Sequence, residues 1–271
     1  MRSVLFTIPL PSFLQSWGLP ESLPVFGYGL MLLVAYLICT FWATRRAKTH
    51  GVDADVVNNI STTALISGVL GARLMHLILY PGGYHNFSDF FKLNEGGLVL
   101  YGFLLTTPLA LWWSLRRNKL TFNSFFLIFL PVVPLGIGIG RLGCFLNGCC
   151  YGVKGDQPWC VTFPDDAPAY GGGILESFPV HPSQLYAFAM GALVSLCLGW
   201  LPTIIRSLKG YQMALSFLFL YGLARLIEEG FRGDTPPHFL GLLTAGQGTS
   251  LLLMTVSLPL LAYSLKKEKQ V

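Results

Sequence analysis

Three arginines occur in long apolar stretches of the sequence, where a charged side chain is costly. Arg73 interrupts one stretch, and Arg141 and Arg225 lie near the ends of two others. An arginine in a membrane span costs roughly 2.5–3.5 kcal/mol on insertion scales, so it usually faces a polar interior and marks a functional site. For Arg73, a structural and a functional role are equally supported. Because a guanidinium presents paired donors to phosphate oxygens, Arg141 and Arg225 would form a lipid-phosphate receptor if they converge at headgroup depth.

A structural ion pair is the alternative explanation for Arg225. Arg225 and Glu229 are four residues apart, as are Glu228 and Arg232, which places both pairs on one helix face with Tyr221. We favour a functional role for Arg225 over a purely structural one.

A glycine-rich run surrounds Arg141. Residues 136–152 read GIGIGRLGCFLNGCCYG. Glycines in a membrane helix let a neighbouring helix or a ligand approach the backbone closely. Helix packing explains Gly136 and Gly140, but it does not explain a glycine-rich run that continues past an arginine to Asn147. This run therefore indicates a site.

Four of the six cysteines lie in a predicted outer loop: Cys144, Cys149, Cys150 and Cys160. This clustering suggests an oxidising compartment, with one or two disulfides that hold the loop. Metal binding is the weaker alternative, because the adjacent Cys149 and Cys150 lack the usual C-x-x-C ligand spacing. The missing C-x-x-C also argues against a disulfide-generating redox enzyme.

The elements that must position these residues are membrane spans. The chain has 271 residues, of which 53% are hydrophobic and 11% charged. Ordinary soluble domains have about 25% charged residues. This composition excludes a disordered chain and argues strongly against a soluble fold. The net charge of +5 is distributed over short loops between apolar intervals, so we expect no nucleic-acid partner.

Seven apolar intervals are long enough to cross a hydrocarbon core of ~30 Å. They cover residues 22–44, 60–80, 96–115, 120–140, 177–205, 210–229 and 235–265. Basic residues follow the first, third, fifth and seventh intervals, which places the N-terminus outside and the C-terminus in the cytoplasm by the positive-inside rule. We therefore expect an all-α polytopic membrane protein with seven transmembrane helices and a long outer loop at residues 142–179.

The chain is predicted to form a single transmembrane domain over residues 1–271, since it shows no long repeat, low-complexity tract or soluble domain. Residues 1–21 do not read as a cleavable signal, because Pro9, Pro11 and Pro20 interrupt the apolar run. They are more typical of an interfacial segment.

Motifs spread over nearly the whole chain resemble one bacterial family. Residues 140–152 (GRLGCFLNGCCYG) are similar to the signature of the prolipoprotein diacylglyceryl transferases. Other stretches agree in the same order: residues 28–31 (YGLM), 43–47 (ATRRA), 71–73 (GAR), 181–186 (HPSQLY), 221–232 (YGLARLIEEGFR) and 246–247 (GQ).

The resemblance implies an enzyme of the bacterial cytoplasmic (inner) membrane. Such an enzyme transfers the diacylglyceryl group of phosphatidylglycerol to the lipobox cysteine thiol of a preprolipoprotein, forms a thioether and releases glycerol phosphate. The phosphate leaving group requires cationic partners, and the incoming thiol must lose a proton, since a free thiol has a pKa of ~8.5. This chemistry requires no metal ion or diffusible cofactor.

The resemblance also implies roles for particular residues. Arg141 and Arg225 match the functional arginines of the family, and we expect both to act in catalysis. The expected substrate-binding residues are Tyr28, Arg73, Gly143, Asn147, Gly152, Tyr221, Glu229 and Arg232.

Four positions depart from the family pattern. Tyr101 occupies the position of a histidine that is a favoured candidate for the catalytic base, and tyrosine, with a pKa of ~10, is a poor base unless an arginine lowers its pKa. Cys144 and Cys149 stand at the usual asparagine and glutamate positions, and Ala187 stands where glutamate is usual. Either Tyr101 orients the lipid and another group takes the proton, or the acceptor differs.

His181, at the predicted outer entry to the fifth span, is the best substitute base, with a hydrogen-bonded cap as an equal alternative. Three functions follow: the family transferase, a divergent phosphatidylglycerol-dependent transferase with a different acceptor, or a non-enzymatic transporter. The transporter has little support, because no acidic residue lies mid-span and no inverted repeat is evident.

Overall fold

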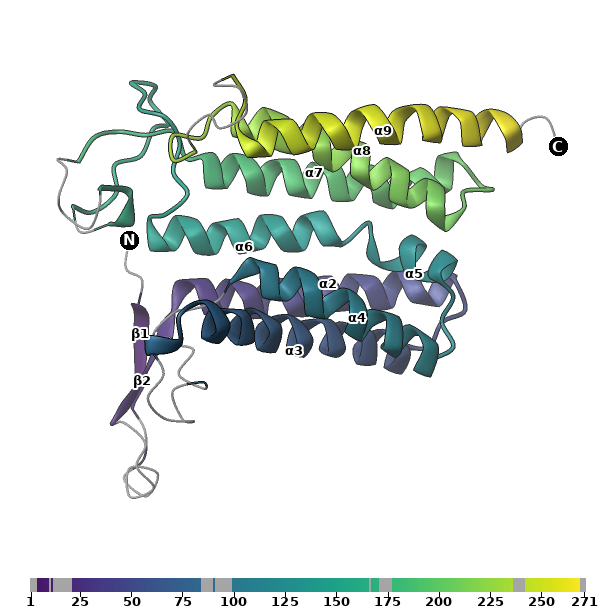
Figure 1. The fold of residues 1–271 in the computed structure, drawn as a ribbon, viewed down its shortest axis with the longest axis horizontal. Coiled ribbons are helices and arrows are strands. Elements are labelled where there is room, and N and C mark those ends of the chain that lie inside the picture. Colours follow the sequence, from purple (N-terminus) through teal and green to yellow (C-terminus); the bar gives the residue numbers. More distant parts are fainter. Residues whose placement is uncertain are drawn as a thin grey trace. The chain divides into compact units, whose positions relative to one another are not determined.

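The computed structural model describes residues 4–9, 11, 21–83, 90, 99–165, 167–170, 177–235 and 242–268, and they are mostly helical (Figure 1). Two strands, β1 (Val4–Pro9) and β2 (Ser22–Phe26), precede the helices. The helices are α2 (Gly27–Thr49), α3 (Ala54–Leu79), α4 (Leu100–Arg117), α5 (Phe122–Phe129), α6 (Val133–Asn147), α7 (Ser183–Ile204), α8 (Gly210–Glu229) and α9 (Ala245–Glu268). Single 3-10 turns occur at Pro81–Gly83 and Pro168–Tyr170.

The chain divides into two compact units, and α2 continues from one into the other. Unit 1 comprises Met1–Cys39 and Phe129–Val271, and unit 2 comprises Thr40–Ile128. Within unit 1, α6 packs on α7, α7 on α8 and α8 on α9. Within unit 2, α3 packs on α4.

Small residues bring α3 and α4 of unit 2 close together. A Cβ on Gly102 would overlap the backbone carbonyl of Gly71, and a Cβ on Gly71 would overlap the Thr106 side chain. Thr106 Oγ1 also donates a hydrogen bond of 2.8 Å to the Ser67 carbonyl. Close backbone approach at glycine, with a hydroxyl bonded across the interface, is typical of helix packing in membranes.

The same principle applies to α6 and α7 in unit 1. A Cβ on Gly191 would overlap the Pro134 carbonyl, and one on Gly138 would lie 3.1 Å from the Phe188 backbone. Ser195 Oγ accepts a hydrogen bond of 2.8 Å from the Leu135 N–H, in the first turn of α6. These contacts fix the helix that carries Arg141 against α7.

The described helices confirm a multi-pass membrane protein. Five of them, α2, α3, α7, α8 and α9, are long and apolar enough to cross a membrane by length and composition. The short helices α5 and α6 meet at a bend of 47° and together qualify as a possible sixth span. Pro131 lies at this break, where a proline cannot continue the helical hydrogen bonds. The 18-residue α4 includes Arg116 and Arg117 and is not among these spans, so the count of seven and the orientation stay predictions.

A short antiparallel pair of strands precedes the first long helix of this mostly helical chain. β1 and β2 pair antiparallel, with Val4 opposite Phe26 and Ile8 opposite Leu23. The first helix therefore begins at Gly27 and not at residue 22. The remainder of the predicted interfacial segment, residues 1–3, 10 and 12–20, lies outside the described residues, as do positions 96–98 and 236–241 of two predicted spans.

The loop between α6 and α7 starts later than predicted, because α6 continues to Asn147. Its described part folds around Tyr170, whose hydroxyl accepts a hydrogen bond of 3.1 Å from the Phe163 N–H and donates one of 2.7 Å to the Phe178 carbonyl. Backbone bridges pair Val180 with Lys154 and with Val161. The loop therefore has a core of its own; residues 166 and 171–176 lie outside the description.

Candidate functional site

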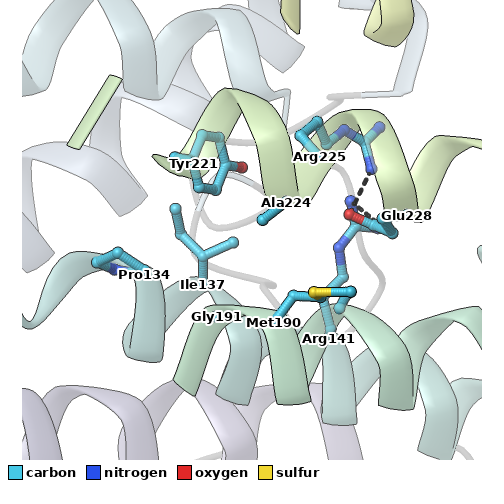
Figure 2. Close-up of a pocket in the computed structure, with 10 residues that line it drawn as sticks. Pro134, Ile137, Arg141, Met190, Gly191, Tyr221, Ala224, Arg225 and Glu228 are labelled. Atoms are coloured by element: carbon cyan, nitrogen blue, oxygen red, sulfur yellow. Dashed lines mark ion pairs between the residues drawn. The ribbon is translucent and has the colours of Figure 1, made fainter. Parts of the chain in front are cut away.

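Arg141 and Arg225 lie on different helices of unit 1 and meet at one carboxylate (Figure 2). Arg141 Nη2 on α6 is 3.4 Å from Glu228 Oε1, and Arg225 Nη1 on α8 is 2.8 Å from Glu228 Oε2. Arg225 Nη2 is also 2.7 Å from Glu229 Oε2. The two guanidiniums thus converge, and the anion between them is a side chain of the protein.

The charges of this cluster balance, with two guanidiniums and two carboxylates. The Glu229 side chain is 1% exposed, whereas those of Arg141 and Arg225 are about one-fifth exposed. Charges that leave water must be paired, because breaking a buried pair by removing one partner costs about 3–5 kcal/mol. The cluster is therefore held together by pairing and opens toward its arginine side.

Thr244 is a member of this cluster that the sequence analysis missed. Its Oγ1 donates a hydrogen bond of 2.8 Å to Glu229 Oε1. Thr244 and Gln247 also form a capping box at the start of α9, in which Gln247 N–H donates to Thr244 Oγ1 and Thr244 N–H donates to Gln247 Oε1, both at 3.1 Å. A Cβ on Gly246 would lie 2.6 Å from Glu229 Cδ. The spacing T-x-x-Q before an apolar run was the signal in the sequence.

The two predicted ion pairs along α8 have different outcomes. The Arg225–Glu229 pair is present, but Glu228 and Arg232 do not pair as expected. Because α8 ends at Glu229, Arg232 lies beyond the helix and turns to Asp234, with Nε at 2.9 Å from Oδ1 and Nη2 at 2.8 Å from Oδ2. Burial alone would lower the pKa of Arg232, and the hydrogen bonds and charge of Asp234 outweigh it and raise that pKa.

A narrow cavity lies beside the arginines. It measures about 20 Å³, enough for one or two water molecules. Arg141, Arg225 and Glu228 lie at one end of it, and Pro134, Ile137 and Tyr221 lie at the other (Figure 2). The cavity therefore has a charged end and a mainly apolar end.

The other predicted residues of the signature serve close packing. A Cβ on Gly143 would lie 2.9 Å from Tyr28 Cδ2, so the glycine admits Tyr28 of α2. A Cβ on Gly152 would overlap the His181 carbonyl, and Gly152 N–H donates to that oxygen at 3.0 Å. Asn147 is the last residue of α6. Gly143 therefore lies on α6 together with Arg141, and Tyr28 packs against that helix from α2.

His181 is buried and does not cap α7, whose N-cap residue is Pro182. Its Nδ1 lies 3.0 Å from the Tyr186 hydroxyl. The ring lines an apolar pocket of about 500 Å³, and Met190 lines both this pocket and the cavity at Arg141. The remaining wall of the larger pocket includes Trp159, Tyr186, Leu193 and Phe231.

Arg73 and Tyr101 belong to unit 2 and are described there. Arg73 is 4% exposed, and its Nε donates a hydrogen bond of 2.9 Å to the Phe90 carbonyl. Tyr101, in the first turn of α4, is 69% exposed.

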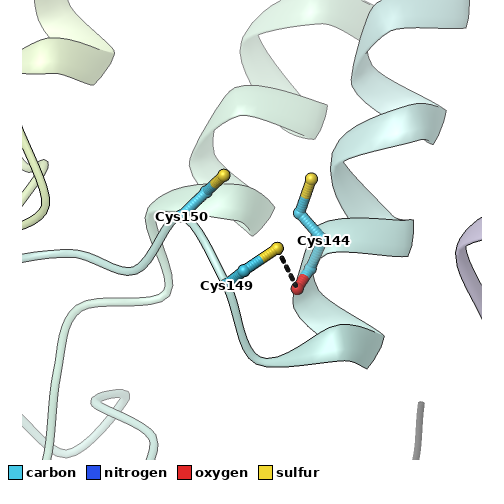
Figure 3. Close-up of side chains that lie close together, drawn as sticks. All are labelled: Cys144, Cys149 and Cys150. Carbon is cyan, nitrogen blue, oxygen red and sulfur yellow. Dashed lines mark hydrogen bonds between the residues drawn. The ribbon is translucent and has the colours of Figure 1, made fainter. Parts of the chain in front are cut away.

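The cysteines do not form the predicted disulfides, since all six are free thiols. The sulfurs of Cys144, Cys149 and Cys150 lie within 4.8 Å of one another (Figure 3). Hydrogen bonding to the Cys144 and Cys150 thiols, together with the charge of Arg141, holds the pKa of the Cys149 thiol well below its usual range.

The fold and the arginine–carboxylate cluster define a multi-pass membrane protein that pairs two arginines with two carboxylates between its helices. The chain belongs to the prolipoprotein diacylglyceryl transferase family, whose profile it matches over residues 16–263.

Similar proteins from three bacterial genera carry the name phosphatidylglycerol–prolipoprotein diacylglyceryl transferase. One from Xanthomonas euvesicatoria pv. vesicatoria is 35% identical over 263 residues, covering 88% of this chain and 86% of the relative. One from Stenotrophomonas maltophilia is 32% identical and covers 88% and 87% of the two chains. A protein from Vibrio cholerae serotype O1 is 32% identical and covers 89% and 87%.

Proposed function

We propose that this chain transfers the diacylglyceryl group of phosphatidylglycerol to the lipobox cysteine thiol of a preprolipoprotein. The products are a thioether-linked lipid and glycerol phosphate. The observation that carries the proposal is the meeting of Arg141 and Arg225, from two helices, at the single carboxylate of Glu228. The names of the relatives support both substrates.

The arginines act as a clamp for the lipid phosphate. When phosphatidylglycerol binds, its phosphate replaces the Glu228 carboxylate between the two guanidiniums, and Arg225 keeps Glu229 as its orienting partner. As the bond to the diacylglyceryl group breaks, negative charge develops on the departing glycerol phosphate, and the guanidiniums stabilise it. The two cations supply this stabilisation without a metal ion.

The acceptor thiol must lose a proton to become the nucleophile. His181 is the base in this proposal, because its ring faces the larger pocket and Met190 connects that pocket with the arginine cavity. When Nδ1 donates to the Tyr186 hydroxyl, Nε2 is the unprotonated nitrogen and accepts the proton. The apolar wall of the pocket suits the hydrophobic segment of a signal peptide.

The remaining predicted residues have supporting roles in the proposal. Tyr28 and Tyr221 contact the lipid beside the arginines, whereas Arg73 and Tyr101 are substrate-contacting residues of unit 2. The shape of the site depends on Gly143, Asn147 and Gly152. Its charge is balanced by Glu229 and Arg232.

We also propose the location and topology expected from the sequence. The chain resides in the bacterial cytoplasmic membrane as one seven-span domain, with its N-terminus outside. The basic residues at the ends of α2 and α4, Arg46 and Lys48 in one and Arg116 and Arg117 in the other, support this orientation.

A second candidate function keeps phosphatidylglycerol but uses another acceptor. The three thiols at the end of α6 support it, since Cys144 and Cys149 replace the residues usual in the family. The two functions share the lipid half of the reaction and differ only in the group that attacks.

A reconstituted assay separates the two. The purified protein in nanodiscs is incubated with phosphatidylglycerol and a lipobox peptide, and mass spectrometry follows the peptide adduct and free glycerol phosphate. We expect the adduct in the native protein and its loss in Arg141→Ala. The matched control is Arg206→Ala, which removes a cation just beyond the C-terminal end of α7.

Each result is decisive. A peptide adduct that depends on Arg141 supports the transferase. Release of glycerol phosphate without an adduct supports the second acceptor. A full adduct yield in Arg141→Ala contradicts the clamp.

A further inference from the structure

A cluster of three thiols, defined by Cys144, Cys149 and Cys150, lies at the end of α6. The three sulfurs come within 4.8 Å of one another, and all three side chains are half-buried (Figure 3). Among the described residues, no other group of three cysteine, histidine or acidic side chains converges in this way. The proposed transfer reaction assigns this cluster no role.

The backbone explains how residues without C-x-x-C spacing converge. Gly148 ends α6 in the left-handed conformation at φ 70°, and Cys150 repeats it at φ 59°. Such a conformation is unfavourable for a residue with a Cβ and persists only where the surrounding structure enforces it. These two reversals turn Cys149 and Cys150 back toward Cys144.

Buried polar side chains from α7 hold this conformation in place. Gln184 Nε2 donates a hydrogen bond of 2.7 Å to the Cys149 carbonyl, and Ser183 Oγ donates one of 2.9 Å to the Cys150 carbonyl. Both side chains are 1% exposed. The positions of two of the three cysteines are therefore built into the helix packing and do not depend on a flexible loop.

The spacing of the sulfurs fits a metal ion. A metal–thiolate bond of about 2.3 Å puts the three sulfurs of a trigonal site about 4.0 Å apart. The observed limit of 4.8 Å exceeds this separation by less than 1 Å, which small side-chain rotations supply. Zn(II) prefers four ligands, but this cluster supplies three. A set of three thiolates suits the softer, monovalent Cu(I).

Two arginines offset the charge of such a complex. Three thiolates around one monovalent ion carry a net charge of −2, which is costly in a half-buried position. Arg141 interacts electrostatically with Cys150 and Cys144, and Arg232 interacts with Cys150. Cationic neighbours favour the thiolate form that a metal requires.

We propose that Cys144, Cys149 and Cys150 form a binding site for Cu(I), coordinated by three thiolates. The thiol protons pass to solvent on binding, and no electron is transferred. The test of this site measures metal binding, so it does not depend on enzymatic activity.

The test uses the full-length protein, purified in detergent, reduced and kept free of oxygen. Cu(I) is titrated in competition with a chromophoric Cu(I) chelator, and X-ray absorption identifies the bound ion's neighbours. We expect one tightly held equivalent with three sulfur ligands. Cys144→Ser, Cys149→Ser and Cys150→Ser should each lower the affinity by more than about 100-fold, since even loss of an outer hydrogen-bond partner costs 10–100-fold.

Cys160→Ser is the matched control, because Cys160 lies in the same loop and its thiol contacts Gln157 instead of the cluster. It should retain the full equivalent of Cu(I). A thermal unfolding curve for each variant separates loss of a metal ligand from loss of the fold. Cys39→Ser, which changes a thiol inside α2, is a second control that should leave Cu(I) binding intact.

Three results would overturn the proposal. They are unchanged Cu(I) affinity in a correctly folded Cys149→Ser variant, no binding by the reduced native protein, and retention of Zn(II) in preference to Cu(I).

Discussion

Removal of Arg225 and removal of Arg141 should differ in their effect on stability while both slow transfer strongly. Arg225 Nη2 is 2.7 Å from Glu229 Oε2, and once the arginine is gone this 1% exposed carboxylate keeps, among the described residues, the Thr244 hydroxyl and the charge of Arg232. Loss of one partner from a buried pair costs about 3–5 kcal/mol. Arg141 is 3.4 Å from Glu228, which retains Arg225 at 2.8 Å. Arg141→Ala should therefore cost only about 1 kcal/mol.

The free energies come from denaturation curves of the purified variants, and the activities come from the peptide-adduct assay. Each arginine should contribute about 10²–10³-fold to the transfer rate, by analogy with removal of one donor from a preorganised anion site. The double variant Arg225→Ala/Glu229→Gln should recover most of the lost stability and none of the activity, because the unpaired buried charge is gone but the clamp is still incomplete.

The reasoning is refuted if Arg141→Ala and Arg225→Ala destabilise the protein equally. It is also refuted if the Glu229→Gln exchange fails to restore stability to Arg225→Ala. Either result would mean that the ion pairs of the structure do not govern the energetics of this cluster.

Three further changes test other contacts. Thr244→Val removes the cap of α9 and a hydrogen bond to a buried carboxylate, and should lower the free energy of unfolding by about 1–3 kcal/mol in a denaturation curve. Thr244→Ser keeps the hydroxyl and should retain most of the native stability. Gly102→Ala inserts a methyl group into the facing α3 carbonyl and should lower the melting temperature, whereas Gly248→Ala, which meets open space, should not. His181→Gln should slow transfer by about 10²-fold or more and flatten its pH–rate profile, with Tyr186→Phe having a smaller effect; an unchanged profile would exclude His181 as the base.

Much of the architecture could be predicted because a membrane helix is recognisable from one continuous stretch of the sequence. A hydrocarbon core demands long runs of apolar residues, so α2, α3, α7, α8 and α9 are visible as long, mostly apolar intervals, of which α3 is interrupted by Arg73 and α8 ends in charged residues. The Arg225–Glu229 pair was predictable for the same reason, since residues four apart in a helix must lie on one face.

Predictions failed where a helix ended or a strand intervened. The expected pair of Glu228 and Arg232 requires the helix to continue, and α8 stops at Glu229. The expected helix start at residue 22 required an isolated apolar segment, but β2 pairs with a strand that lies earlier in the chain. In both cases a contact from outside the local segment decided the outcome.

Composition, apolar intervals and motifs were enough to predict a polytopic membrane protein of the transferase family with arginines at costly positions. The partners of those arginines and the convergence of three cysteines depend on how the helices pack. Arg141 reaches Glu228 across the packing of two helices. Cys144 faces Cys149 and Cys150 because two left-handed residues reverse the chain and α7 holds the turn. Such contacts depend on packing between elements distant in sequence, which no local pattern of residues encodes.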